Sequence, residues 1–317
     1  MLASLIGVAA GAESLRLKST VPLPGVKGRF DHFATDTNRH RIFVAALGNN
    51  TVEVIDAAAV RRLHTITGLH KPTGVVFLPE ANRLFVANGD DGTLKVFDGT
   101  SYELIKSIGG VDDADNVRYD GKTRLLYVGY GEGALGIIDA QKIEQAGSIK
   151  LKAHPESVQL EQTGPRIFVN VPDAKQIAVV DREQRAVIAT WPMEKFQANF
   201  PMALDEANHR LFIGCRKPAR LVVLDTATGQ AIADLPMSGD TDDLFWDGAR
   251  RRIIASCGEG FIDVWSELEG KFQLSQRIAT RSGARTSWYS AVAGELFLTM
   301  PERSGAAAEL RMYSVSR

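Results

Sequence analysis

Cysteine is scarce in this chain, which has only 2 Cys among 317 residues, too few for a fold held together by disulfides. A dominant charge is also lacking, because 37 Lys and Arg stand against 38 Asp and Glu and leave a net charge of -1. Binding to a nucleic-acid backbone depends on an excess of positive charge, so we expect no nucleic-acid partner. The composition is otherwise that of a soluble globular protein, with 44% hydrophobic and 24% charged residues.

Long hydrophobic runs are absent as well, and a membrane span needs about 20 apolar residues. The only candidate is short: residues 1–14 read MLASLIGVAAGAES and end the apolar run in Ala10-Gly11-Ala12. Small residues at this spacing are typical of a signal-peptidase site. We therefore predict a signal-peptide remnant over residues 1–12 and a periplasmic or secreted protein, although no Lys or Arg precedes the run. The remaining residues, 13–317, are expected to form one domain.

Several catalytic motifs are missing too. The chain has no phosphate-binding loop, no GxSxG nucleophile elbow, no HExxH and no CxxC. No stretch keeps a helical period, which excludes a fold of alternating strands and helices.

What the chain has is a repeat. An apolar pair followed by a turn residue recurs seven times, beginning with Val54-Ile55-Asp56, Val96-Phe97-Asp98 and Ile137-Ile138-Asp139. Its interval of about 42 residues is the length of one four-stranded propeller blade. The first unit shows four strand-like runs, at 32–35, 41–45, 51–55 and 62–66. We therefore predict an all-β, seven-bladed β-propeller.

The two ends of the chain support this ring. The last unit, residues 282–317, supplies only three strands, and residues 15–21 resemble the fourth strands of other units. A propeller leaves no blade half paired. We therefore predict that the N-terminal strand completes the C-terminal blade. Cys215 and Cys257 fall in the same column of adjacent blades, too far apart for a disulfide, so both are expected to be free thiols.

In such a ring, the residues before each innermost strand and after the second strand crowd one mouth of the central channel. The purely structural interpretation of these residues is a set of polar turns in which Asp and Asn cap their own backbone. Together, however, two His, one Glu and several Asp would converge and repel unless positive charge sits among them. A divalent cation is one source of that charge, and Arg216 and Arg285 are another. The turns at the opposite end of the channel, such as residues 36–40 and 247–250, are predicted to be solvated connections.

From these convergent positions we predict three sets of site residues. The predicted metal ligands are His32, Asn116, His154, Glu156 and Asp242, with Asn199 as a further candidate. The predicted ligand-binding residues are Asp31, Asp113, Asp115, Tyr130, Asn199, Arg216, Asp240 and Trp288. The predicted catalytic residues are His32, His154 and Arg285. Carboxylates and amides suit Ca²⁺ or Mg²⁺, whereas use of both His favours a transition metal.

The repeats at residues 41–45 with 51–56, and at 83–88 with 93–98, resemble the bacterial YVTN-repeat, YncE-like propeller family. The resemblance implies seven blades and a periplasmic or surface location, and little about function. Two groups of propeller enzymes have sites of similar style. Glu156, Asn116, Asn199 and Asp242 are similar in type to the Ca²⁺ ligands of gluconolactonase-type propellers, and His32 and His154 to the His of Mg²⁺-dependent virginiamycin-lyase-type propellers.

Two functions follow from this sequence. The first is a non-catalytic, monomeric propeller whose acidic, His-containing mouth binds a small polar ligand and a divalent metal. The second is a metal-assisted hydrolase or lyase acting on a small polar substrate such as a lactone or ester.

Overall fold

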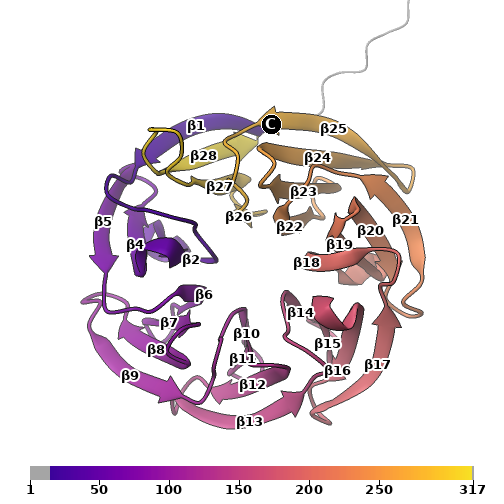
Figure 1. Ribbon diagram of the computed structural model, residues 1–317, viewed down its shortest axis with the longest axis horizontal. Helices are drawn as coiled ribbons and strands as arrows, with labels where there is room; N and C mark the ends of the chain where they lie inside the picture. The colour runs from indigo at the N-terminus through magenta and orange to yellow at the C-terminus, as the bar shows by residue number, and fades with distance from the viewer. Residues whose placement is uncertain (1–14, 316–317) are drawn as a thin grey trace, which may run out of the picture.

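The computed structural model describes residues 15–315 and is built from seven four-stranded antiparallel sheets. The sheets stand around a common axis like the blades of a propeller, with the innermost strand of each next to the channel (Figure 1). Seven blades and an all-β class were predicted from the repeat, and both predictions are confirmed. The signal-peptide prediction concerns residues 1–12, which lie outside the described residues.

The strands run from the channel outward in chain order within blades 1 to 6. Blade 1 consists of β2 (Phe33–Asp36), β3 (Arg41–Ala46), β4 (Thr51–Asp56) and β5 (Arg61–Ile66); blade 2 of β6 (Pro72–Leu78), β7 (Arg83–Asn88), β8 (Thr93–Asp98) and β9 (Leu104–Gly109); blade 3 of β10 (Val117–Asp120), β11 (Leu125–Tyr130), β12 (Ala134–Asp139) and β13 (Glu144–Lys150). Blade 4 consists of β14 (Val158–Leu160), β15 (Arg166–Val171), β16 (Gln176–Asp181) and β17 (Ala186–Pro192); blade 5 of β18 (Gln197–Asp205), β19 (Arg210–Lys217), β20 (Ala219–Asp225) and β21 (Ala231–Pro236); blade 6 of β22 (Thr241–Asp247), β23 (Arg252–Cys257), β24 (Phe261–Leu268) and β25 (Lys271–Ala279). Blade 7 consists of β26 (Ser287–Ser290), β27 (Glu295–Met300), β28 (Glu309–Val315) and, from the other end of the chain, β1 (Leu15–Pro22). Four single-turn 3-10 helices interrupt the connections: η1 (Thr37–Arg39), η2 (Leu47–Asn49), η3 (Pro172–Ala174) and η4 (Glu206–Asn208).

The hydrophobic core lies between the blades. The second strand of blade 1, RIFVAA, is buried along its whole length because neighbouring blades cover both of its faces. Phe43 packs there against Phe77 of blade 2, with ring centroids 5.2 Å apart. The outermost strands, such as β5 with mostly exposed residues, need only one apolar face. Stacking around a ring thus buries every second and third strand and leaves the innermost strands lining the channel.

Closure of the ring depends on both ends of the chain. β1 pairs antiparallel with β28, from Leu15 opposite Val315 to Pro22 opposite Glu309. Thr286 of blade 7 donates a hydrogen bond from Oγ1 to the carbonyl of Phe30, 3.0 Å away, next to blade 1. The predicted closure by the N-terminal strand is confirmed. No helix among residues 15–315 is long and apolar enough to cross a membrane.

The turns opposite the candidate site are exposed at residues 37–40 and 248–249, as predicted, but the Asp that begins each of these turns is buried. Arg41 lies 2.7 Å from Asp36 in an ion pair of which both partners are almost fully buried. Asp247 is fully buried and accepts from Arg252 and from the Tyr289 hydroxyl, which lies 2.5 Å from Oδ2. Each buried Asp pairs with the Arg at the start of the next strand, a contact that the sequence prediction did not include.

Candidate functional site

The segment just before each innermost strand carries its side chains to the channel mouth. The amide of Asp31 donates to the carbonyl of Ala45, 2.8 Å away, and the amide of Asp115 makes the same contact with Gly129, at 2.9 Å. Glu156 is held in the same way in blade 4. This repeated backbone bond extends the pairing of strands one and two by a residue. It therefore places carboxylates from several blades at one height around the axis.

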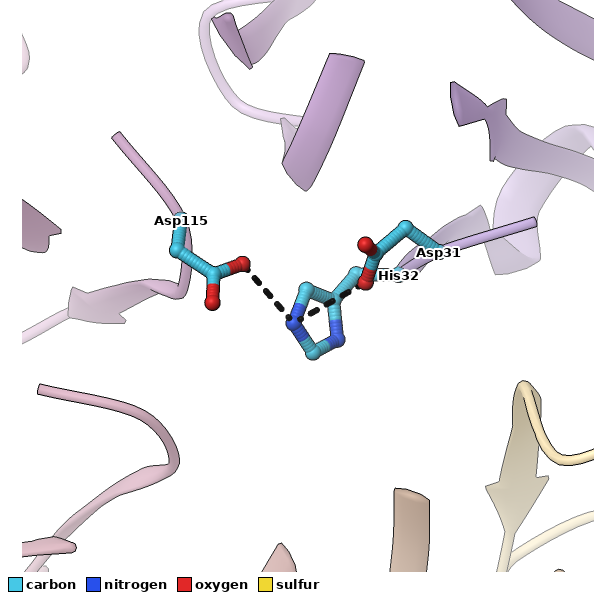
Figure 2. A group of neighbouring side chains, drawn as sticks. All are labelled: Asp31, His32 and Asp115. Atoms are coloured by element: carbon cyan, nitrogen blue, oxygen red, sulfur yellow. Dashed lines mark ion pairs between the residues drawn. The ribbon is translucent and has the colours of Figure 1, made fainter. Parts of the chain in front are cut away.

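His32 sits between two of these carboxylates near the channel axis (Figure 2). Its Nε2 lies 3.5 Å from Asp31 Oδ1 and 3.6 Å from Asp115 Oδ1. The three side chains are only 15 to 19% exposed. These ligand atoms are close enough together to hold one metal ion.

Asn116 adds an amide to the same point. Its side-chain nitrogen lies 2.9 Å from His32 Nε2, and the residue is 3% exposed. Its Oδ1 is buried and has no hydrogen-bond partner among residues 15–315, an arrangement that costs free energy in a protein interior. Rotation of the side-chain amide by 180° exchanges the positions of its oxygen and nitrogen. The Asn116 oxygen can therefore point toward the same space as His32 Nε2.

A second group of potential ligands shares Asp115. Asp115, His154 and Glu156 also bring one ligand atom each into mutual reach. His154 Nδ1 lies 2.7 Å from the Gly131 carbonyl, to which it donates, so Nε2 is left as the nitrogen that can bind a metal. A backbone carbonyl holding the second ring nitrogen is a common feature of metal-binding His. Asp31, His32, Asp115, His154 and Glu156 are called the axial cluster below.

Protons balance the charges of this cluster when no cation does. Burial raises the pKa of Glu156 to about 9 and that of Asp31 to about 7, and in both cases neighbouring carboxylates add to the effect. Burial opposes the charged form of His32, but Asp31 and Asp115 outweigh it and raise the pKa of His32 to about 9. The pKa of Asp115 is lowered despite burial, because the imidazole of His32 lies 3.6 Å from its carboxylate. At neutral pH the cluster thus holds an imidazolium beside Asp115 and a protonated Glu156.

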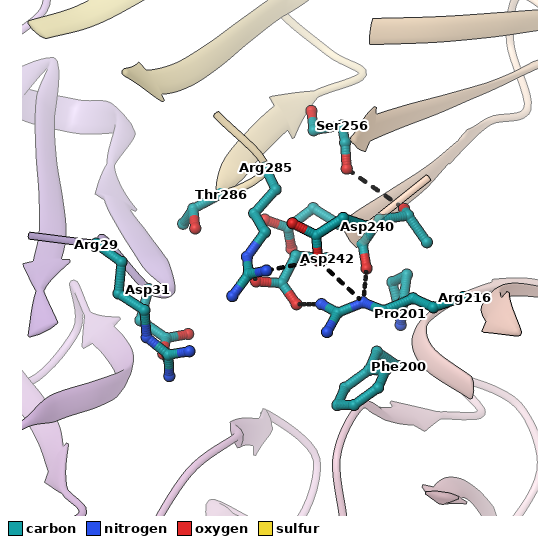
Figure 3. Close-up of polar contacts among 12 residues, drawn as sticks. Arg29, Asp31, Phe200, Pro201, Arg216, Asp240, Asp242, Ser256, Arg285 and Thr286 are labelled. Carbon is teal, nitrogen blue, oxygen red and sulfur yellow. Dashed lines mark hydrogen bonds and ion pairs between the residues drawn. The ribbon is translucent and has the colours of Figure 1, made fainter. Parts of the chain in front are cut away.

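The arginines of blades 5 and 7 form a separate ion-pair network (Figure 3). Arg285 lies 2.6 Å from Asp240 and 3.0 Å from Asp242. Arg216 pairs with Asp242 as well, and its guanidinium stacks 3.9 Å from the centre of the Phe200 ring. Asp242 therefore has two cationic partners of its own, which makes it a weaker candidate metal ligand than the axial cluster.

Other predicted site residues lie away from the axial cluster or at its edge. Asp113 is 58% exposed and pairs with Lys71. The hydroxyl of Tyr130 lies 3.1 Å from the hydroxyl of Ser148, which belongs to the outermost strand of the same blade. Asn199 is fully buried and donates to Asn170 Oδ1 of the neighbouring blade, 2.9 Å away. The structure brings neither Tyr130 nor Asn199 together with the cluster, whereas Asp113 Oδ2 lies at its edge, 3.7 Å from His154 Nδ1.

A cavity of about 370 Å³ lies next to the cluster. His32 and Asn116 line one part of it, and Trp288, predicted as a ligand contact, lines another. Two charged residues of its wall, Arg118 and Asp243, were not singled out from the sequence as individual site residues. Burial raises the pKa of Asp243 to about 7. Both lie on innermost strands, so the blade register was the signal that could have found them.

Comparisons with known proteins support the fold. No protein-family model matches the chain, and no curated protein does. A chain in the crystal structure of a mitotic checkpoint complex is similar in structure, with a TM-score of 0.80 at 15% sequence identity. The match covers 100% of this chain and 97% of that chain. A likeness at this identity establishes a propeller fold and carries no function with it.

Proposed function

We propose that the axial cluster binds a divalent metal ion at the mouth of the channel and that this ion forms part of a binding site for a small polar ligand. The observation that carries the proposal is the approach of His32 Nε2 to Asp31 and Asp115, with the side-chain amide of Asn116, whose oxygen has no partner, beside His32. Like charges and unpartnered polar atoms are costly in a buried site. A cation would offset both costs at once.

The donor types favour a first-row transition ion. Each of the two ligand groups contains one imidazole and two carboxylates. Imidazole nitrogen suits Zn²⁺ or Mn²⁺ better than Ca²⁺ or Mg²⁺, which prefer oxygen alone. Because Asp115 belongs to both groups, it is the residue on which binding should depend most.

Isothermal titration of the chelator-treated protein with Zn²⁺, Mn²⁺, Ca²⁺ and Mg²⁺ tests the proposal. We expect Zn²⁺ or Mn²⁺ to bind most tightly, and Asp115→Asn to weaken binding by about tenfold or more, since even residues behind the ligands contribute about 10–100-fold. Asp90→Asn, which removes an exposed carboxylate of blade 2, is the matched control and should bind as the parent does. Absence of binding by all four ions at millimolar concentration would refute the proposal.

A second candidate function is a metal-assisted hydrolase or lyase. The specific observation in its favour is that Asp243, whose pKa is raised to about 7, lines the same cavity as His32, while Glu156, whose pKa is raised to about 9, belongs to the axial cluster. Titratable groups shifted in this way are typical of acid–base catalysis. Turnover of lactones or esters by the metal-loaded protein, lost in His32→Ala and His154→Ala but kept in Asp90→Asn, would support it. A broad screen without turnover would leave the binding function alone.

Three sequence predictions remain as proposals about the whole chain: export, membership of a family, and a monomeric state. The residues at 10–12 and the repeats support export and membership of the YVTN-repeat, YncE-like family. Sequencing of the N-terminus of the expressed protein tests export, because cleavage after Ala12 would leave Glu13 first. The expected monomer is tested by the mass of the protein in solution.

A further inference from the structure

One level of the channel wall is formed by seven equivalent residues. Each of them lies on an innermost strand, opposite the centre of the second strand of its blade. They are Ala34, Val76, Arg118, Gln159, Ala203, Phe245 and Trp288. All but Ala203 line the cavity of about 370 Å³. Six of the seven carry no charge, so Arg118 stands alone as a cation among small, amide and aromatic side chains.

Arg118 is also poorly partnered. Its Nη1 donates to the carbonyl of its own neighbour Val117, 2.9 Å away. No carboxylate among residues 15–315 lies within ion-pair distance of its guanidinium, in contrast to Arg216 and Arg285. Burial lowers the pKa of Arg118, although Asp243 and Asp115 partly offset this. A half-buried guanidinium with four N–H donors left over is a receptor for an anion.

The shape and polarity of the cavity restrict that anion. Its volume is near the lower end for ligand pockets, so the ligand is small. Val76, Phe245 and Trp288 give it apolar walls. A single guanidinium near several carboxylates suits one negative charge better than two, which favours a monocarboxylate over a phosphate.

We infer that the channel binds a small organic monocarboxylate with an apolar body, whose carboxylate pairs with Arg118 while its body lies against Val76, Phe245 and Trp288. The inference deepens the proposed function and rests on it for charge balance, because a metal in the axial cluster would reduce the repulsion between the ligand and Asp115 or Asp243. Metal and carboxylate should then bind with positive linkage.

Titration with phenylacetate, with and without the divalent ion that binds tightest, tests the inference. We expect phenylacetate to bind more tightly when the metal is present. Arg118→Met should weaken binding by about ten- to a hundredfold, the usual value of charged hydrogen bonds, and Arg118→Lys by less. Arg124→Met, an exposed arginine of the same blade, should change nothing. Neutral phenylacetamide should not bind.

Several outcomes would overturn the inference: equal binding of phenylacetate to Arg118→Met and the parent, equal binding of phenylacetamide, tighter binding of inorganic phosphate, or no binding of phenylacetate with or without metal. The two proposals fail separately. Phenylacetate binding through Arg118 in a protein that binds no metal would refute the metal site and keep the carboxylate site. Metal binding without phenylacetate binding would do the reverse. Circular dichroism of each variant verifies that it is folded.

Discussion

The side-chain amide of Asn116 lies 2.9 Å from His32 Nε2, although 84 residues separate the two along the chain. The contact joins blade 1 to blade 3 across the channel mouth. It lies outside the hydrophobic clusters that pack these blades against their neighbours. It leaves the Asn116 oxygen buried without a partner. A buried oxygen of this kind is satisfied either by a bound cation or by rotation of the amide toward a protonated His32.

The stability of the metal-free protein should fall as the pH rises from 4.5 toward about 9. Glu156, whose pKa is raised from 4.5 to about 9, keeps a proton in the folded state that the unfolded chain has lost, so deprotonation favours unfolding in this range. The imidazolium of His32 stabilises the fold below its ordinary pKa of 6.5, and this contribution is lost as pH rises through about 9. Melting temperatures across this range check the sign. Glu156→Gln should flatten the profile, and a melting temperature that rises with pH would contradict the assignment.

A bound metal ion should offset the loss of stability that we expect at high pH. Binding must release the protons on His32 and Glu156, so the rise in melting temperature produced by Zn²⁺ or Mn²⁺ should grow as the pH rises from about 6 to about 9. Paired thermal scans with ion and with chelator measure it. A shift that is constant with pH would exclude these two residues as ligands.

Removal of residues 1–22 should destabilise the entire molecule. β1 supplies the outermost strand of blade 7, and without it β28 would become an exposed edge with unpaired backbone groups. We expect a lower melting temperature with a single cooperative transition. Removal of residues 1–14 alone keeps β1 and is the matched control. An unchanged melting temperature for the longer deletion would contradict ring closure by this strand.

The repeat register predicted the blades, their closure and the mouth at which Asp31, His32, Asp115 and Glu156 meet. These results depend on local patterns that recur about every 42 residues, so alignment of one blade on the next is enough. The register could not predict which of these side chains bind to other protein residues and so do not face the axial cluster. Asn199 turns into the blade interface and Asp242 pairs with two arginines, and both outcomes depend on rotamers and neighbours from other blades.

Asp247→Asn should destabilise the protein strongly. The carboxylate is fully buried and contacts Arg250, Arg252 and the Tyr289 hydroxyl, so its loss removes the acidic member of a buried ion pair. Removing one partner of a buried pair costs about 3–5 kcal/mol, which denaturant unfolding can measure. Asp90→Asn should stay within about 0.5 kcal/mol of the parent, as surface substitutions do. Similar values for the two variants would show that the pair contributes nothing.

Cys215 and Cys257 should resist thiol reagents in the native protein. Both are free and fully buried, as the sequence predicted, and burial raises the pKa of Cys215 to about 12. The thiolate is the reactive form, so modification should require unfolding. Counting modified thiols by mass spectrometry before and after denaturant checks this. Rapid labelling of the folded protein would contradict it.

Arg118→Met should leave the melting temperature of the ligand-free protein unchanged or raise it. A half-buried guanidinium without a carboxylate partner lowers stability through its lost hydration, and Met has a similar length without the charge. Residues that serve a site are often retained at such a cost. Thermal unfolding of Arg118→Met, Arg124→Met and the parent distinguishes a role of Arg118 in fold stability from a role in ligand binding. A marked drop for Arg118→Met alone would assign Arg118 to the stability of the fold, whereas a stable variant that fails to bind phenylacetate would assign it to the ligand.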